Sequence, residues 1–288
     1  MDLDPRLHAF RPDLADIRLN GKVESARFVE GAVRRVVASS APLKRTPRAD
    51  ATLESEILRG EMFTVFEDAS EGWSWGQLET DGYVGYVPTD ALGAAAPEPT
   101  HRVAALRTFI HPGPDMKLPA EGALSFASLV ALDDEAEARG TRYRRIAGGE
   151  GWIVAKTAEL VDAPPANDFV GVAERFLNTA YLWGGRTSLG LDCSSLVQLS
   201  LAAAGIAAPR DTDHQEAMLG AEVEGGVSAP LHRGDFVFWA GHVGIMIDGE
   251  YLLHANGHHM ATVIEPLEVV VERIAAKTGR PTSVRRLT

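Results

Sequence analysis

The chain has 288 residues, and the 45% that are hydrophobic are enough to build more than one core, which excludes a disordered protein. It carries 28 Lys+Arg against 40 Asp+Glu, and the net charge of −12 repels nucleic-acid phosphates and anionic membranes. The basic runs are only pairs, which ordinary solvated surface explains. We therefore expect neither a nucleic-acid partner nor a membrane partner.

Cysteine content and apolar runs indicate the compartment. The single cysteine, Cys193, excludes an intramolecular disulfide, so stability does not depend on an oxidising environment. The first thirty residues hold no apolar run of seven or more, and no stretch approaches the roughly twenty residues of a membrane span. We expect a cytoplasmic protein, and its oligomeric state stays unknown.

Two proline-containing stretches of small residues, 94–99 and 162–166, are typical of linkers. The N-terminal segment holds a predicted helix near Val23 to Val33, with no function assigned. Together these features predict four parts: an N-terminal segment 1–34, a first β module 35–95, a second β module 101–162 and a mixed α/β domain 167–288.

Each β module consists of short apolar runs broken by Pro and Gly, such as Met62–Phe66 and Thr108–Ile110. Gly85–Val87 and Gly151–Ile153 share a Gly-aromatic-aliphatic pattern, which predicts a late barrel strand with an inward-facing aromatic ring. Each module resembles a bacterial SH3-like domain. The alternative is one larger β domain in which the Gly-aromatic pattern occurs twice by chance.

The C-terminal part alternates helix and strand patterns. Apolar residues recur at helical spacing after Asp168, and a second helix is predicted from Ser194 to Ala204, with Gly205 as a left-handed stop. The predicted strands that follow are Phe236–Trp239, His242–Ile247 and Tyr251–Ala255.

Cys193 lies between Asp192 and Ser194 where the second helix begins. Unpaired backbone N–H groups and the positive end of the helix dipole favour a thiolate there, and the same N–H groups suit an oxyanion. Cys193 is therefore the candidate nucleophile, although a lone cysteine is often simply a small buried hydrophobe.

A thiol nucleophile needs a base, which histidine supplies near neutral pH. His242 and His254 lie on two strands joined through Asp248-Gly249. A three-residue loop Ile247–Gly249, with Gly249 at positive φ, pairs the two histidines on one face and lets His254 orient His242. A two-residue loop would instead place them on opposite faces.

Six motifs together resemble the NlpC family of cell-wall cysteine peptidases. They stand in the family's order: Tyr181–Gly185, Leu191–Ser195, Pro209–Asp211, Gly234–Phe238, His242–Ile245 and His254–Ala255. The resemblance implies an α+β, papain-like catalytic domain preceded by two small SH3-like barrels. It places the catalytic residues at Cys193, His242 and His254. Ser195 departs from the family's usual glycine.

The order of modules resembles the cytoplasmic γ-D-glutamyl-L-diamino acid dipeptidyl-peptidases. This resemblance implies hydrolysis of the γ-D-Glu-diamino acid bond in free murein peptides, with release of L-Ala-γ-D-Glu during cell-wall recycling. The implied substrate-binding residues are Asp192, Ser194, Tyr181, Thr212, Tyr83 and Glu61. For Asp192 a helix cap is an equal alternative; Tyr86 is an alternative to Tyr83; and Glu61 with Tyr83 also fits a surface acid beside a barrel tyrosine.

Other functions remain open: a murein endopeptidase acting on intact wall, an acyl-transferring relative, and a catalytically dead wall-binding protein. No metal site or cofactor is implied, because the chain has no Cys-x-x-Cys and a zinc ion would compete for the thiolate that catalysis needs. The sequence leaves open whether the diamino acid is diaminopimelate or lysine.

Overall fold

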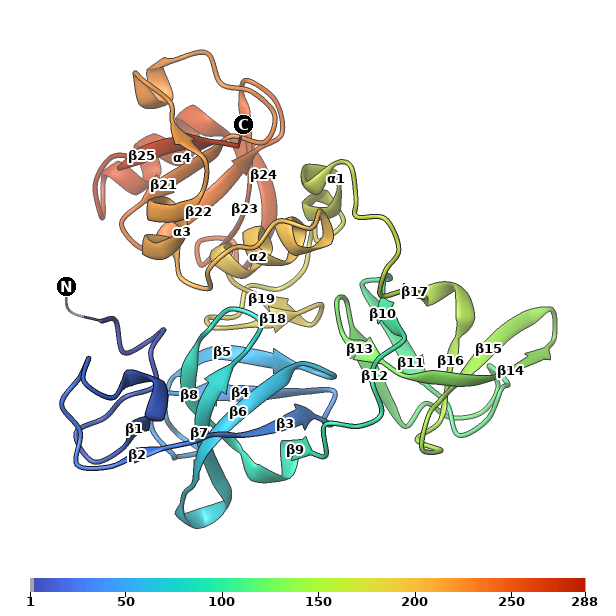
Figure 1. Ribbon diagram of the computed structural model, residues 1–288. Helices are drawn as coiled ribbons and strands as arrows, with labels where there is room; N and C mark the ends of the chain where they lie inside the picture. Colours follow the sequence, from blue (N-terminus) through green and yellow to red (C-terminus); the bar gives the residue numbers. More distant parts are fainter. Residues whose placement is uncertain (1–2, 288) are drawn as a thin grey trace. The chain divides into compact units, whose positions relative to one another are not determined.

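The structure is a computed structural model that describes residues 3–287. The chain forms two compact units, Met1–Ala163 and Pro164–Thr288 (Figure 1). Within the described residues, no helix is long and apolar enough to cross a membrane. Short 3₁₀ helices connect several strands: Ile17–Leu19, Ser70–Gly72, Thr89–Ala91, Ala155–Thr157 and Gly226–Ser228.

The first part of unit 1 is a seven-stranded antiparallel sheet in the order β5-β4-β8-β7-β6-β3-β9. It closes around a core that includes Leu43, Ile57 and Phe63. The strands are β3 (Ala32–Val36), β4 (Ser40–Lys44), β5 (Leu53–Leu58), β6 (Met62–Asp68), β7 (Trp73–Leu78), β8 (Val84–Pro88) and β9 (Leu92–Gly93).

The prediction of a helix near Val23 to Val33 is wrong. This region instead contains β2 (Phe28–Val29), paired in parallel with β1 (Ala15–Asp16), and the start of β3. Because β3 pairs with β6 on one side and β9 on the other, sheet pairing overrides the weak local preference for helix. The predicted boundary at residue 34 therefore falls inside a strand.

The second part of unit 1 has its own core, including Val103, Leu124 and Ile153. Its strands form three small sheets, β13-β10-β17, β11-β12 and β14-β15-β16. Their bounds are β10 (His101–Val103), β11 (Arg107–Ile110), β12 (Gly122–Ser125), β13 (Leu129–Val130), β14 (Leu132–Ala138), β15 (Thr141–Ile146), β16 (Trp152–Val154) and β17 (Ala158–Leu160).

The shared Gly-aromatic-aliphatic pattern forms a strand in both places. The prediction that its aromatic ring faces inward is wrong. Val87 and Ile153 are fully buried in the two cores, whereas Tyr86 and Trp152 are only partly buried. Side chains alternate across a strand, so a buried aliphatic residue places its neighbouring ring on the other face.

Unit 2 is a six-stranded antiparallel sheet in the order β20-β25-β21-β22-β23-β24, with helices beside it (Figure 1). A small hairpin, β18 (Arg186–Thr187) and β19 (Gly190–Leu191), precedes the sheet. The other elements are α1 (Phe169–Glu174), α2 (Cys193–Ala203), α3 (Thr212–Met218), α4 (Leu267–Ala275), β20 (Ala221–Glu222), β21 (Phe236–Trp239), β22 (His242–Met246), β23 (Tyr251–Asn256), β24 (Ala261–Pro266) and β25 (Ser283–Arg286).

Helix α2 confirms the sequence-based prediction closely. Asp192 is its N-cap, and Gly205, just past its end, has a φ of 74°. The residues from Cys193 to Leu201 are buried on every side of the helix, so packing rather than one amphipathic face holds it in place. It packs against β22 and β23 (Figure 1), which brings its first residue to the strands that carry the two histidines.

The hairpin between β22 and β23 differs from the expected register. Met246 pairs with Leu252, not with Glu250, and the Ile247 N–H donates to the Tyr251 carbonyl, which leaves Asp248–Glu250 as the loop. Gly249 does not adopt positive φ; instead the Asp248 carboxylate accepts the backbone N–H groups of Glu250 and Tyr251 at 2.8 Å each. The register is shifted by two residues, which keeps every side chain on its predicted face.

Candidate active site

Cys193 is the first residue of α2, and its side chain is buried. Burial and the nearby Asp192 carboxylate raise the pKa of the thiol to about 12, although backbone N–H groups of Val243 and Ser194 donate to the sulfur and oppose that rise. Burial therefore opposes the thiolate that the helix start favours. A base must remove the thiol proton before attack.

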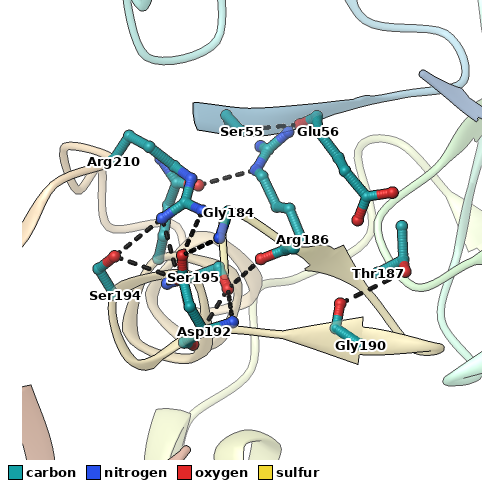
Figure 2. A network of polar contacts seen from close by, with 12 residues as sticks. Ser55, Glu56, Gly184, Arg186, Thr187, Gly190, Asp192, Ser194, Ser195 and Arg210 are labelled. Carbon is teal, nitrogen blue, oxygen red and sulfur yellow. Dashed lines mark hydrogen bonds and ion pairs between the residues drawn. The ribbon is translucent and has the colours of Figure 1, made fainter. Parts of the chain in front are cut away.

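Asp192 and Ser195 form a reciprocal cap at the start of α2 (Figure 2). The Asp192 carboxylate accepts the Ser195 N–H at 2.9 Å, and the Asp192 N–H donates to the Ser195 hydroxyl at 3.0 Å. The hydroxyl also donates to the Gly185 carbonyl at 2.7 Å. The departure from glycine at position 195 thus adds bonds that lock the helix start to the preceding loop.

Asp192 also forms a buried ion pair with Arg210 (Figure 2). Arg210 donates to both carboxylate oxygens, at 3.0 and 2.7 Å, and its side chain is 1% exposed. Ser194 and the Gly184 N–H donate to the same carboxylate. Burial would raise the pKa of Asp192, but Arg210 and the hydrogen bonds hold it below its usual value. Five donors already occupy the roughly four acceptor positions of a carboxylate.

The histidine pair forms one end of a chain of polar contacts. His242 Nε2 lies 2.8 Å from His254 Nδ1, and His254 Nε2 lies 2.9 Å from Glu265 Oε2. Arg273 then donates to both oxygens of Glu265, at 2.6 Å each. The prediction that the two imidazoles share one face and touch is confirmed.

Burial, with the adjacent His254 and Arg273, lowers the pKa of His242 to about 3. His242 is therefore neutral in the resting site. Within residues 3–287 no hydrogen bond joins His242 to the sulfur, so the predicted contact with Cys193 stays a prediction. Because Nε2 faces His254, Nδ1 is the nitrogen left for the thiol.

The remaining residues predicted from the resemblance lie in both units. In unit 2, Tyr181 is close enough to Cys193 and Asp192 for their charges, after burial, to raise its pKa; Thr212 begins α3. In unit 1, Tyr83 is 3% exposed within the barrel core, and Glu61 is buried and accepts the Leu58 N–H at 2.7 Å. Tyr83 fits the barrel-tyrosine alternative, whereas the expected surface acid is wrong because Glu61 is buried. Binding by either residue stays a prediction.

Sequence reasoning missed the roles of Arg210, Glu265 and Arg273. Arg210 lay within a recognised motif, so its pairing with an acid at a helix start was a possible inference. Glu265 carried no such signal, since its contact with His254 depends on the pairing of β23 with β24. Arg273 reaches Glu265 from α4.

Potential metal ligands gather elsewhere in unit 2. Asp211, Asp213 and His214 bring one ligand atom each within 4.8 Å of one another. In the part of the chain that the structure describes, this grouping contains neither Cys193 nor His242, and nothing in the catalytic geometry depends on it.

Unit 2 thus combines a buried cysteine at a helix start with a histidine pair on the adjoining sheet. Residues 178–274 match the model of the NlpC/P60 family, and residues 43–92 match that of the bacterial dipeptidyl-peptidase Sh3 domain. The chain thus carries a region that matches the NlpC/P60 family, and a region that matches a dipeptidyl-peptidase Sh3 domain precedes it.

Curated relatives match this chain over part of its length. The chain is 27% identical over 118 residues to a gamma-D-glutamyl-L-lysine dipeptidyl-peptidase of Bacillus cereus, covering 37% of this chain and 33% of the relative. It is 32% identical over 101 residues to the Bacillus subtilis protein of the same name, covering 31% and 32% respectively. The matches therefore span about a third of the length of these curated relatives.

A solved structure shares the fold over most of the chain. The crystal structure of an NlpC/P60 family protein from Bacillus cereus superposes with a TM-score of 0.69 at 20% identity, covering 88% of this chain and 99% of that one. At this identity the likeness concerns the fold alone.

Proposed function

We propose that this protein hydrolyses the γ-D-Glu-diamino acid bond of free murein peptides that begin with L-Ala, releasing L-Ala-γ-D-Glu in cell-wall recycling. The observation that carries the proposal is the match of residues 43–92 to a dipeptidyl-peptidase-type Sh3 domain in the same chain as an NlpC/P60 domain. The names of the Bacillus relatives support the same bond.

In the proposed mechanism Cys193 is the nucleophile, and His242 takes its proton as the sulfur attacks the γ-carbonyl carbon. N–H groups at the start of α2 hold the oxyanion. The C–N bond then breaks, His242 returns the proton to the leaving amine, and water hydrolyses the thioester with the same base. His254 orients His242 through the 2.8 Å contact.

Recognition of a free amino end is the part of the proposal that separates a dipeptidyl-peptidase from an endopeptidase. An ammonium group in a closed site loses hydration worth several kcal/mol and needs acceptors in return. We assign this contact to Asp192 and Ser194, with Tyr181, Thr212, Tyr83 and Glu61 as the further candidates. Since Asp192 is already saturated with donors, the amine must displace one of them, and the Ser194 hydroxyl at 3.2 Å is the longest of its bonds.

The test uses matched peptides L-Ala-γ-D-Glu-diamino acid with a free or an acetylated amino end, followed by mass spectrometry. Loss of the charge and addition of the acetyl group should lower kcat/KM about 30-fold to several-thousand-fold, equivalent to about 2 to 5 kcal/mol. Lysine and diaminopimelate versions identify the diamino acid. Equal rates for free and acetylated peptides would favour an endopeptidase on intact wall.

A further inference from the structure

We propose that Glu265, held by Arg273, is a positioning residue that selects the tautomer of His254 and thereby leaves a basic nitrogen of His242 for Cys193. The inference rests on the proposed cysteine peptidase function but not on the choice of substrate. It adds two positioning residues, Glu265 and Arg273, behind the three proposed catalytic residues.

The geometry holds the Glu265 carboxylate in one orientation. Arg273, from α4, donates one hydrogen bond to each oxygen at 2.6 Å, and the Glu265 side chain is 12% exposed. Such two-point contacts restrict both the position and the plane of a carboxylate. Oε2 is then 2.9 Å from Nε2 of His254, whose side chain is fully buried.

The charge state of Glu265 decides the hydrogen-bond direction. Burial would raise its pKa, but the contacts with His254 and Arg273 bring it well below its ordinary value, so the carboxylate only accepts. Burial lowers the pKa of His254, so the neutral ring must carry its one hydrogen on Nε2. Its Nδ1 is then a lone pair that accepts from His242 Nε2–H, and the lone pair of His242 is on Nδ1.

The neighbouring Asn256 favours the other tautomer of His254. Asn256 Nδ2 lies 3.1 Å from the same His254 Nε2, and its Oδ1 accepts the N–H groups of His258 and His259, which fixes the amide nitrogen toward His254. A neutral amide donor is weaker than a charge-assisted contact at 2.9 Å. The carboxylate therefore determines the tautomer, and Asn256 alone would reverse it.

His259 is a further titratable group near the carboxylate. Its Nδ1 lies 3.5 Å from Glu265 Oε2, and 37% of its side chain is exposed. Protonation of His259 adds positive charge beside Glu265 without occupying the 2.9 Å contact with His254. The tautomer assignment therefore holds in either state of His259.

The deciding variant is Glu265→Gln, which keeps the size but places an amide N–H₂ where an acceptor is required. With Arg273 donating to the remaining oxygen, the amide nitrogen faces His254 and favours hydrogen on its Nδ1. His242 then presents N–H to the sulfur instead of a lone pair. We expect kcat to fall about 100-fold or more with little change in KM, as for other tautomer-reversing substitutions.

Two readouts do not depend on any peptide substrate. In ¹⁵N-histidine NMR of the whole protein, His254 should carry hydrogen on Nε2 in the wild type and on Nδ1 in Glu265→Gln. The rate of Cys193 alkylation by iodoacetamide at neutral pH should fall in the variant. If the wild type cleaves none of the murein peptides, the proposed function fails, while these two measurements still decide the role of Glu265.

Glu174→Gln is the matched control. Glu174, on α1, also pairs with an arginine, Arg233, but it makes no contact with the histidine pair among the described residues. It should leave kcat, the tautomer and the alkylation rate unchanged. Arg273→Met tests the same arrangement should Glu265→Gln not fold, and should lower kcat about 3- to 10-fold with KM unchanged. An unchanged His254 tautomer in a folded Glu265→Gln, or an unchanged kcat in Arg273→Met, overturns the proposal.

Discussion

His242 Nε2 lies 2.8 Å from His254 Nδ1, although the strand register places the two residues diagonally rather than directly opposite. A diagonal pair on one face is within reach of long or aromatic side chains. The contact occupies one nitrogen of His242 and so determines which nitrogen remains for the thiol of Cys193.

Replacing the nucleophile should abolish turnover. Cys193→Ala removes the sulfur through which the acyl-enzyme forms, and alanine fits the buried first turn of α2 without a new polar group. Activity should vanish in the peptide assay while the thermal midpoint stays near the wild-type value. A folded variant that retains more than about 5% of the activity would remove Cys193 from its role.

The pH dependence of activity and of alkylation should reflect the shifted pKa values of His242 and Cys193. Since the pKa of His242 is lowered to about 3, the base stays neutral well below the ordinary histidine value of about 6.5, and kcat/KM should hold down to about pH 5. Since the pKa of Cys193 is raised to about 12, alkylation of the free enzyme should keep rising from pH 6 to pH 9. A flat alkylation rate across this range would indicate a preformed thiolate-imidazolium pair.

Removing Arg210 should destabilise the start of α2. Arg210→Met leaves the Asp192 carboxylate buried without its cation, which should cost about 3 to 5 kcal/mol in the free energy of unfolding at pH 7. Urea unfolding of both proteins measures the difference.

The same pair predicts the sign of a pH effect. Arg210 helps to lower the folded-state pKa of Asp192, so the stabilisation is present above the unfolded value of about 3.9 and is lost as the pH falls through the folded value. In Arg210→Met, burial instead favours the protonated acid. The difference in unfolding free energy should therefore shrink from pH 7 to pH 4, and a constant difference would contradict the assignment.

The loop before α2 should not tolerate a side chain at Gly185. A Cβ there would lie 2.6 Å from the Gly190 carbonyl oxygen, and Gly185 itself accepts the Ser195 hydroxyl bond that holds the helix start. Gly185→Ala should lower stability by about 1 to 3 kcal/mol and slow Cys193 alkylation.

Gly122→Ala is the control for that substitution, since the nearest atom to its Cβ is 3.7 Å away and the strand accepts alanine. Its thermal midpoint and alkylation rate should match the wild type. Equal midpoints for Gly185→Ala and Gly122→Ala would show that the loop adjusts freely.

Local sequence was sufficient for features that depend on neighbours along the chain. The capping residue Asp192, the buried helix after it and the stop at Gly205 all follow from short-range preferences, and α2 has the predicted limits within one residue. The common face of His242 and His254 also followed, because strand alternation survives a register error of two residues.

Only the tertiary structure decided the charges and partners around these residues. Burial opposes the thiolate that the helix start favours at Cys193, and the pairing of β23 with β24 brought Glu265 to His254. Arg210 reached Asp192 from a separate segment eighteen positions along the chain. Local preferences act over a few residues, whereas desolvation and ion pairing depend on which distant segments meet. Motif spacing therefore predicted candidate catalytic residues but not the residues that determine their protonation.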